Sequence, residues 1–230
     1  MAELVILDTP EDLPQLAADR VARSLRAAVL ARGRASLALA GGTTPKAIYE
    51  ALALRDELPW AALDFFFGDE RCVPPDHEDS NFRMAHEALL QPRALAAAQI
   101  FRMEGERDDR DAAALAYDAL LPERLDLLLL GMGPDGHTAS LFPGDPALRE
   151  PARRVLPVFG PKPPPWRLTL TPPAIRAARE VFVFAFGASK APKVREALEG
   201  PDDPASTPIQ LARDGVWFLD RAAASLLSAR

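Results

Sequence analysis

The sequence predicts a single α/β domain over residues 1–230, built on an open, doubly wound and mainly parallel sheet with helices on both faces. Short apolar runs alternate along the chain with longer amphipathic ones. Several short runs, such as Leu127–Leu130 and Val181–Phe186, are apolar at every position, which is typical of strands covered on both faces. No repeat or low-complexity tract divides the 230 residues. One Rossmann-like layer structure therefore accounts for the whole chain.

The individual elements follow from periodicity. Eight short segments are expected as strands: Leu4–Leu7, Ser36–Ala40, Asp64–Phe67, Leu125–Leu130, Val155–Phe159, Arg167–Thr171, Glu180–Phe186 and Val216–Leu219. A helix is expected between the first two strands, because apolar residues from Leu13 to Val29 recur every three or four positions, and it should end near Gly33. Further helices are expected over Thr44–Arg55, Ser80–Leu90, Asp109–Leu121, Lys190–Leu198 and Arg221–Ser228.

The composition argues against nucleic-acid and membrane partners. The chain carries 27 basic and 33 acidic side chains, a formal net charge of −6, so it lacks a broad basic face for phosphate backbones or anionic lipids. Its apolar runs, such as Val181–Phe186, are far shorter than the ~20 residues that cross a bilayer, and no signal peptide is visible. The one cysteine, Cys72, cannot form an intrachain disulfide. We therefore expect a cytoplasmic protein, a monomer or a weak homo-oligomer, whose anion sites are local.

Four loops rich in glycine and polar residues follow four of the expected strands. They are Gly41–Pro45, Gly68–Arg71, Gly131–Thr138 and Gly187–Lys190. In a parallel sheet the carboxyl ends of all strands lie on one edge, and ligands bind in the crevice there. We therefore expect these loops to converge on one site, provided that their strands lie close together in the sheet.

The first of these loops has the parts of an anion-binding helix start. Gly41 and Gly42 let the backbone approach a ligand closely. Thr44 is expected as the N-cap and Pro45 as the first helical residue. Free N–H groups at such a helix start, together with the hydroxyls of Thr43 and Thr44, favour a phosphate. The alternative is a capped helix without a ligand, and the spacing does not match the nucleotide P-loop.

The third loop, Gly131–Thr138, contains the strongest catalytic candidate. Its glycines match the GxGxxG pattern of dinucleotide sites, but Pro134 and the Phe-Pro-Gly stretch that follows argue against the uninterrupted helix such a site needs, so no cofactor is expected. His137 can take and return a proton near neutral pH, and Asp135 could orient its ring. The alternative is a histidine that is satisfied by backbone groups in a sharp turn.

Charged residues near other strand ends complete the candidate site. Asp69 and Arg71 follow the third expected strand, where an arginine could bind a phosphate or hydroxyl group, or form a structural salt bridge instead. Lys190 stands at a helix start where a phosphate could sit, and is otherwise a solvated lysine. Arg167 either points into the crevice or merely starts a strand. The polar run 76–79 lacks the spacing of metal ligands, so no metal is expected.

Taken together, these segments resemble the 6-phosphogluconolactonase family, within the wider group that includes glucosamine-6-phosphate deaminases and isomerases. The resemblance spans nearly the whole chain, and its central motif is highly specific. The segments that carry it are Leu39–Pro45, Gly68–Pro74 with Ser80-Asn81, Gly131–Pro143, Arg167–Thr171 and Gly187–Lys190. The family's fold is an open parallel-sheet α/β domain, in agreement with the fold expected above.

The resemblance implies hydrolysis of 6-phospho-D-glucono-1,5-lactone to 6-phospho-D-gluconate, a step of the oxidative pentose phosphate pathway. His137 matches the family's general base, which activates water to attack the C1 carbonyl, and Asp135 matches the acid that supports it. Three positions, Arg71, Arg167 and Lys190, match basic residues associated with the substrate. The loop Gly41–Thr44 would close around the substrate phosphate. Neither a metal nor a cofactor is implied, because a lactone is already an activated ester.

Two alternatives remain open. A glucosamine-6-phosphate deaminase of the same group has a glutamate five residues after the histidine, where this chain has Phe142, and a tyrosine where it has Arg71. Both departures disfavour that activity. The second alternative is a non-catalytic sugar-phosphate sensor, because related folds serve bacterial regulators. Those regulators carry a helix-turn-helix segment, whereas the first expected strand here lies at the start of the sequence.

Overall fold

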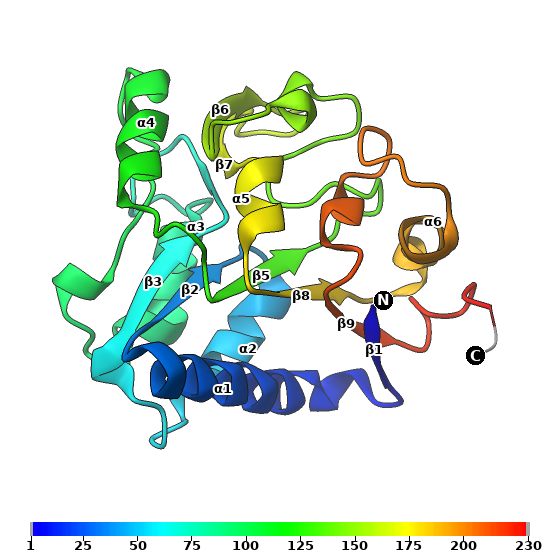
Figure 1. The fold of residues 1–230 in the computed structure, drawn as a ribbon, viewed down its shortest axis with the longest axis horizontal. Helices are drawn as coiled ribbons and strands as arrows, with labels where there is room; N and C mark the ends of the chain where they lie inside the picture. Colours follow the sequence, from blue (N-terminus) through cyan, green and yellow to red (C-terminus); the bar gives the residue numbers. More distant parts are fainter. Residues whose placement is uncertain (1, 229–230) are drawn as a thin grey trace.

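The structure, a computed structural model, describes residues 2–228 and is built around a six-stranded sheet in which all neighbouring strands are parallel (Figure 1). The spatial order of its strands is β1 (Glu3–Leu7), β9 (Val216–Asp220), β8 (Glu180–Ala185), β5 (Leu127–Gly131), β2 (Ala35–Leu39) and β3 (Leu63–Phe67). Each of these strands overlaps a predicted one. The predicted fold class is thus confirmed.

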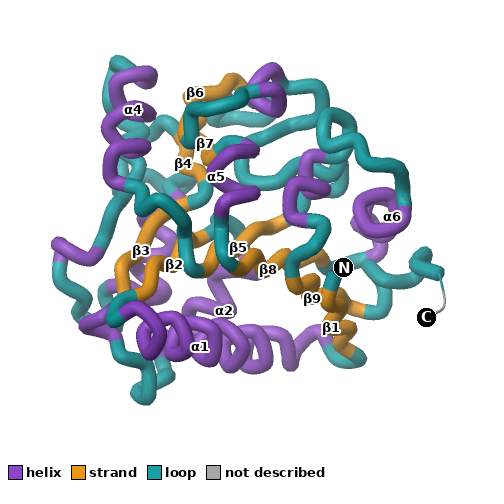
Figure 2. Tube along the Cα trace, in the orientation of Figure 1, coloured by secondary structure: helices purple, strands orange, loops and turns teal. Residues whose placement is uncertain are grey.

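Helices cover both faces of this sheet (Figure 2). The first face carries α1 (Leu13–Arg32), α2 (Thr43–Ala53) and α3 (Asn81–Ala85), which continues as a π-helix over His86–Leu90. The second face carries α4 (Arg110–Leu120), α5 (Pro172–Ala177) and α6 (Ala191–Glu199). Within residues 2–228, no helix is both long and apolar enough to span a membrane.

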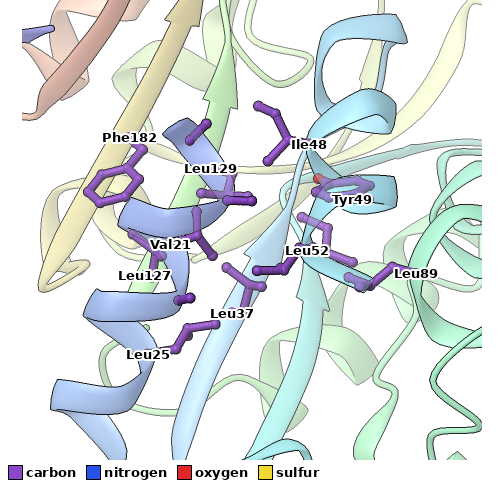
Figure 3. Packing of buried hydrophobic residues seen from close by; sticks show 14 of the residues in the cluster. Val21, Leu25, Leu37, Ile48, Tyr49, Leu52, Leu89, Leu127, Leu129 and Phe182 are labelled. Atoms are coloured by element: carbon purple, nitrogen blue, oxygen red, sulfur yellow. The ribbon is translucent and has the colours of Figure 1, made fainter. Parts of the chain in front are cut away.

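The central strands are apolar at every position because each of their faces meets a different core. In β2, Leu37 and Leu39 belong to the core under α1 and α2, whereas Ala38 between them belongs to the core on the opposite face. Figure 3 shows the first core, where Val21 of α1 and Ile48 of α2 pack over the strands. Burial of one such side chain contributes roughly 1.5–3 kcal/mol. The sheet is therefore a firm platform for the loops that leave its carboxyl edge.

A second, antiparallel sheet of three strands adjoins the helices of the second face. It consists of β4 (Asp69–Arg71), β7 (Trp166–Leu170) and β6 (Val155–Phe159). The strands predicted at 155–159 and 167–171 therefore exist, but they do not extend the parallel sheet. Pro157 suits β6 because that strand is an edge strand of its sheet. β4 was not predicted, since its three charged residues show no apolar pattern.

Three local predictions differ from the structure. The segment 221–228 forms turns instead of a helix: Asp220 caps it as it would cap a helix, but the N–H groups of Ser225 and Leu227 then donate to carbonyls three residues back instead of four. Helix α2 begins at Thr43 and its N-cap is Gly42, so the prediction of Thr44 as the N-cap is wrong. Gly42 has φ +107°, which glycine adopts without strain. α5 was not predicted, because six residues are too few to show helical periodicity.

Candidate active site

The four glycine-rich loops leave strands that are direct neighbours in the sheet, in the order β8, β5, β2 and β3. After β2 the chain adds β3 on one side of it and β5 on the other, so the order of the strands reverses between β2 and β5. A cavity of about 270 Å³ lies there, lined in part by the residues that follow these two strands. Such a reversal point is where open α/β sheets bind ligands. The predicted convergence of the loops is confirmed.

Most of the candidate residues line this cavity: Gly41, Gly42, Asp69, Arg71, His137, Arg167 and Lys190. Thr43 and Thr44 do not line it; they occupy the first turn of α2, where Thr43 is exposed and Thr44 half-buried. Asp135 reaches the site through a hydrogen bond to His137. The candidate base and the candidate phosphate-binding cations thus share one cavity.

His137 and Asp135 form a tightly bonded pair. Nδ1 of His137 lies 2.5 Å from Oδ1 of Asp135, and the same oxygen accepts the backbone N–H of His137 at 3.2 Å. Because an ionised carboxylate only accepts hydrogen bonds, Nδ1 carries the proton and Nε2 keeps a free lone pair. The ring is therefore held by a carboxylate. The alternative interpretation required backbone groups to hold it. This tautomer is the one that a general base needs.

The pair has room only because residue 133 is glycine. A Cβ at Gly133 would lie 2.1 Å from Cε1 and Nδ1 of His137 and 2.5 Å from Oδ1 of Asp135. The turn is closed by the Gly133 N–H, which donates to the His137 carbonyl at 2.9 Å, and by the Gly136 N–H, which donates to the Gly133 carbonyl at 3.0 Å. The glycines of the GxGxxG pattern thus fold a tight turn around a histidine ring and open no helix.

Burial sets the protonation of the pair. It lowers the pKa of His137 below the ordinary value, although the hydrogen bond and charge of Asp135 oppose it. For Asp135, burial alone would raise the pKa, but the hydrogen bond and charge of His137 outweigh it and the pKa lies below its ordinary value. The ring of Phe142, with its centroid 4.8 Å from that of His137, packs against the imidazole. At neutral pH the pair is therefore a neutral imidazole beside a carboxylate.

Asp69 is a buried carboxylate with a donor at each of its oxygens. Nδ2 of Asn81 donates to Oδ1 at 3.0 Å and to the Asp69 carbonyl at 2.9 Å, and Oγ of Ser140 donates to Oδ2 at 2.6 Å. Asn81 can lie so close because residue 41 is glycine, where a Cβ would stand 2.0 Å from the Asn81 Oδ1. Nη1 of Arg167 lies 3.5 Å from the Ser140 hydroxyl. These contacts fix Asp69 on the cavity wall near Arg167.

Three cations of the cavity are anchored by backbone carbonyls and not by carboxylates. Arg71 and Arg167 are register partners on β4 and β7, and they donate to the carbonyls of Asp79 at 2.5 Å and Lys162 at 3.4 Å. Nζ of Lys190 donates to the Met132 carbonyl at 2.5 Å. Burial lowers the pKa of both Arg167 and Lys190. Because their charges stay without an ion pair among residues 2–228, they favour an anionic ligand.

These contacts decide two alternatives that the sequence left open. The salt bridge considered for Arg71 is absent among residues 2–228, where its guanidinium meets a carbonyl. Lys190 is half-buried and hydrogen-bonded, so it is not a freely solvated lysine. Arg167 both occupies a strand and lines the cavity, so the two options considered for it are compatible.

Glu70 holds the loop that carries Asp69 and Arg71. Its buried carboxylate accepts hydrogen bonds from the backbone N–H groups of Arg71, Asn81 and Phe82 and from the Ser80 hydroxyl, at 2.7–3.0 Å. Burial raises the pKa of Glu70, and these hydrogen bonds oppose the effect. Ser80 is also the N-cap of α3, as predicted, and accepts the Arg83 N–H. Glu70 therefore ties β4 to the start of α3.

Sequence reasoning missed Gly133, Asn81, Ser140 and Glu70 as contributors to the site. All four stood inside the resembling motifs, but no spacing rule says which carboxylate or ring each of them contacts or leaves room for. Ser140 and Asn81 are both 2% exposed or less, and their hydrogen bonds to the Asp69 carboxylate show their role. Among residues 2–228, no three His, Cys, Asp or Glu side chains gather as metal ligands would.

Comparisons with known proteins show which family and fold the chain shares. Residues 8–218 match the family model described as glucosamine-6-phosphate isomerases/6-phosphogluconolactonase. A 6-phosphogluconolactonase of Streptomyces coelicolor is 41% identical, with 98% of this chain and 94% of that protein covered. A 6-phosphogluconolactonase structure from Shewanella baltica superposes with a TM-score of 0.87 at 31% identity, covering 96% and 98% of the two chains. A monomeric glucosamine-6-phosphate deaminase superposes with a TM-score of 0.82 at 26% identity, covering 97% and 99%.

Proposed function

The chain belongs to the family of glucosamine-6-phosphate isomerases and 6-phosphogluconolactonases, and we propose that it is a hydrolase that converts 6-phospho-D-glucono-1,5-lactone to 6-phospho-D-gluconate in the pentose phosphate pathway. One observation carries the proposal: a base of defined tautomer, His137 held by Asp135, lines the same cavity as the cations Arg71, Arg167 and Lys190. A phosphosugar ester needs an anion site and a base at a fixed separation, and this cavity supplies both.

Substrate binding is assigned to the cations and to the start of α2. The phosphate dianion is attracted by Arg167 and Lys190, which hydrogen-bond to backbone carbonyls and form no ion pair with a carboxylate among residues 2–228. The backbone at Gly41 and Gly42 lines the cavity, and the N-terminus of α2 follows it directly. Binding at this remote group orients the lactone, so that interaction energy is used to position C1 beside the base.

The chemical step assigned to His137 is the activation of water. Nε2 takes a proton from the water while the water oxygen bonds to C1, and the π electrons of the C1 carbonyl move onto the carbonyl oxygen. When the C1–O5 bond breaks, the proton passes from His137 to O5, which becomes the 5-hydroxyl. The new carboxylic acid then loses its own proton to solvent. Arg71 lines the same cavity and can stabilise the negative charge that develops on the carbonyl oxygen.

Deamination of glucosamine 6-phosphate is the main competing activity. The glucosamine-6-phosphate deaminases of this group carry a glutamate at the position of Phe142, and that glutamate is used in opening the sugar ring. In this chain Phe142 is buried and packs its ring against His137, so no carboxylate can act from that position. A non-catalytic sensor is disfavoured for a different reason. Ligand binding alone has no use for a histidine whose tautomer is fixed by a carboxylate.

A paired assay tests the proposal. Freshly generated 6-phosphogluconolactone is added to the protein and its disappearance is corrected for spontaneous hydrolysis, while ammonia is measured with glucosamine 6-phosphate. We expect catalysed hydrolysis of the lactone and no ammonia. Ammonia release would assign the chain to the deaminases, and phosphosugar binding without turnover of either compound would assign it to the sensors.

The cellular setting is part of the same proposal. The substrate is a small, charged and short-lived lactone, and it has to be hydrolysed where it is formed. A cytoplasmic location accords with this and with the single free cysteine, Cys72. We also keep the expectation of a monomer or a weak homo-oligomer, which sedimentation across a range of protein concentrations measures.

A further inference from the structure

A stiff loop stands between β6 and β7, in the smaller sheet at the top of Figure 1. Its sequence, residues 160–165, is Gly-Pro-Lys-Pro-Pro-Pro, and the Gly160 N–H closes it by donating to the Pro165 carbonyl at 2.7 Å. Because proline fixes φ, four prolines in six residues leave this loop few conformations. Lys162 is exposed on it. The loop therefore presents one ammonium group at little further cost in backbone entropy.

The loop rests against the wall of the candidate site. Gly160 approaches Phe142 so closely that a Cβ there would lie 2.6 Å from Cε2 of the phenyl ring. The same ring packs against His137, and the guanidinium carbon of Arg167 lies 5.8 Å from its centroid. From the other side, Nη2 of Arg167 lies 3.4 Å from the Lys162 carbonyl. The backbone that carries Lys162 is thus fixed to two residues of the cavity region.

The ammonium of Lys162 has no partner among residues 2–228. Two of the other lysines lie near carboxylates: Lys46 is 4.0 Å from Glu50 and Lys193 is 2.7 Å from Glu196. Burial is the main reason why the pKa values of His137 and Lys190 are lowered, and the positive charge of Lys162 adds to both shifts. Lys162 does not itself line the cavity, but its charge acts on two residues that do, His137 and Lys190.

On the proposed lactonase function, we propose that Lys162 is a further phosphate ligand and a specificity-determining residue, which selects phosphorylated lactones over neutral ones. The reacting ester has to lie beside the buried His137, so the phosphate at the other end of the substrate lies nearer the rim. A dianion is costly to desolvate fully, which favours the same orientation. At the rim, Lys162 completes the cation set of Arg167 and Lys190.

The test compares two substrates, 6-phosphogluconolactone and unphosphorylated D-glucono-1,5-lactone. Lys162→Gln should raise KM for the phosphorylated lactone about five- to tenfold, the range of a partly exposed charge-assisted contact. The ratio of kcat/KM between the two lactones should fall by the same factor, and Lys162→Arg should restore most of it. The control is Arg26→Gln, which removes an exposed cation from α1 on the opposite face of the sheet.

The outcomes separate this inference from the function on which it rests. If the wild-type protein hydrolyses neither lactone, the proposed function fails before any variant is made. If the wild type is active and Lys162→Gln keeps its KM, only the inference is wrong. An equal loss of kcat with both lactones would also overturn it, because Lys162 would then act at the reacting ester. An equal KM change in Arg26→Gln would reduce the effect to net charge and overturn it likewise.

Discussion

Gly133→Ala is the substitution for which the structure makes the sharpest prediction. The new Cβ would stand 2.1 Å from the His137 ring and 2.5 Å from the Asp135 carboxylate, whereas ordinary contacts begin near 3.4 Å. The ring must therefore move by more than an ångström. Misplacement of a catalytic group by about 1 Å costs roughly 100-fold in rate, or about 2.7 kcal/mol in activation free energy. We expect kcat for the phosphorylated lactone to fall by that factor.

Two further variants show whether the loss runs through the ring. Gly131→Ala alters the same loop at a position where a Cβ meets no protein atom within 4 Å, so its kcat loss should be at least about tenfold smaller. Because Gly131 lines the cavity, this variant can raise KM, and only its kcat serves as the control. In the double variant with His137→Ala, the ring that the methyl group strikes is gone, and Gly133→Ala should add little. A folded Gly133→Ala protein with wild-type kcat would refute the reasoning. So would a double variant in which the two losses multiply.

Other predictions concern the residues around this pair. Asp135→Asn should lower kcat about 100-fold or more. Because Asp135 raises the pKa of His137, the substitution should also move the acidic limb of the pH profile of kcat/KM to lower pH. A limb that moves to higher pH would contradict this. The profile is measured with unphosphorylated gluconolactone, since a phosphate titrates near pH 6. Glu70→Gln should lower the free energy of unfolding, measured in urea, by about 3 kcal/mol, because backbone N–H groups that donate to the buried carboxylate lose an acceptor oxygen. A loss below about 1 kcal/mol would contradict this prediction. Arg167→Ala or Lys190→Ala should raise KM about tenfold or more with a smaller change in kcat; an unaltered KM would remove their phosphate role.

The parallel sheet could be predicted because its central strands are buried on both faces. Segments such as Leu127–Leu130 carry that burial in their composition, and the loops after them carry the glycines. The convergence of the loops followed from sheet geometry alone. It held because β8, β5, β2 and β3 are neighbours, which no local pattern states.

The second sheet could not be predicted from local patterns. β4 is only Asp-Glu-Arg, and its strand conformation comes from pairing with β7, nearly a hundred residues later in the chain. That pairing places Arg71 opposite Arg167 and so builds the cationic wall. The turns at 221–228 are a similar case, because Asp220 caps the segment as it would cap a helix, and no local pattern shows that the following hydrogen bonds reach back three residues instead of four.

Within the site, the reactive and charged residues were easier to predict than the residues that position them. His137, Asp135 and the cations stand out by residue type. Their positions depend on Gly133, which leaves room for the ring, and on Asn81 and Ser140, which bind Asp69. Such residues are recognised by distances, and a sequence contains none. The N-cap of α2 shows the same limit, since both Gly42 and Thr44 suit the role and only the backbone conformation decides.

The central claim is that His137 is the base and the cations hold the phosphate, and His137→Ala separates the two most directly. The measurement is kcat for 6-phosphogluconolactone beside the dissociation constant of 6-phosphogluconate from titration calorimetry. The account predicts a loss of about 100- to 10,000-fold in kcat with the dissociation constant changed by less than about threefold. A His137→Ala protein that keeps wild-type kcat would contradict it.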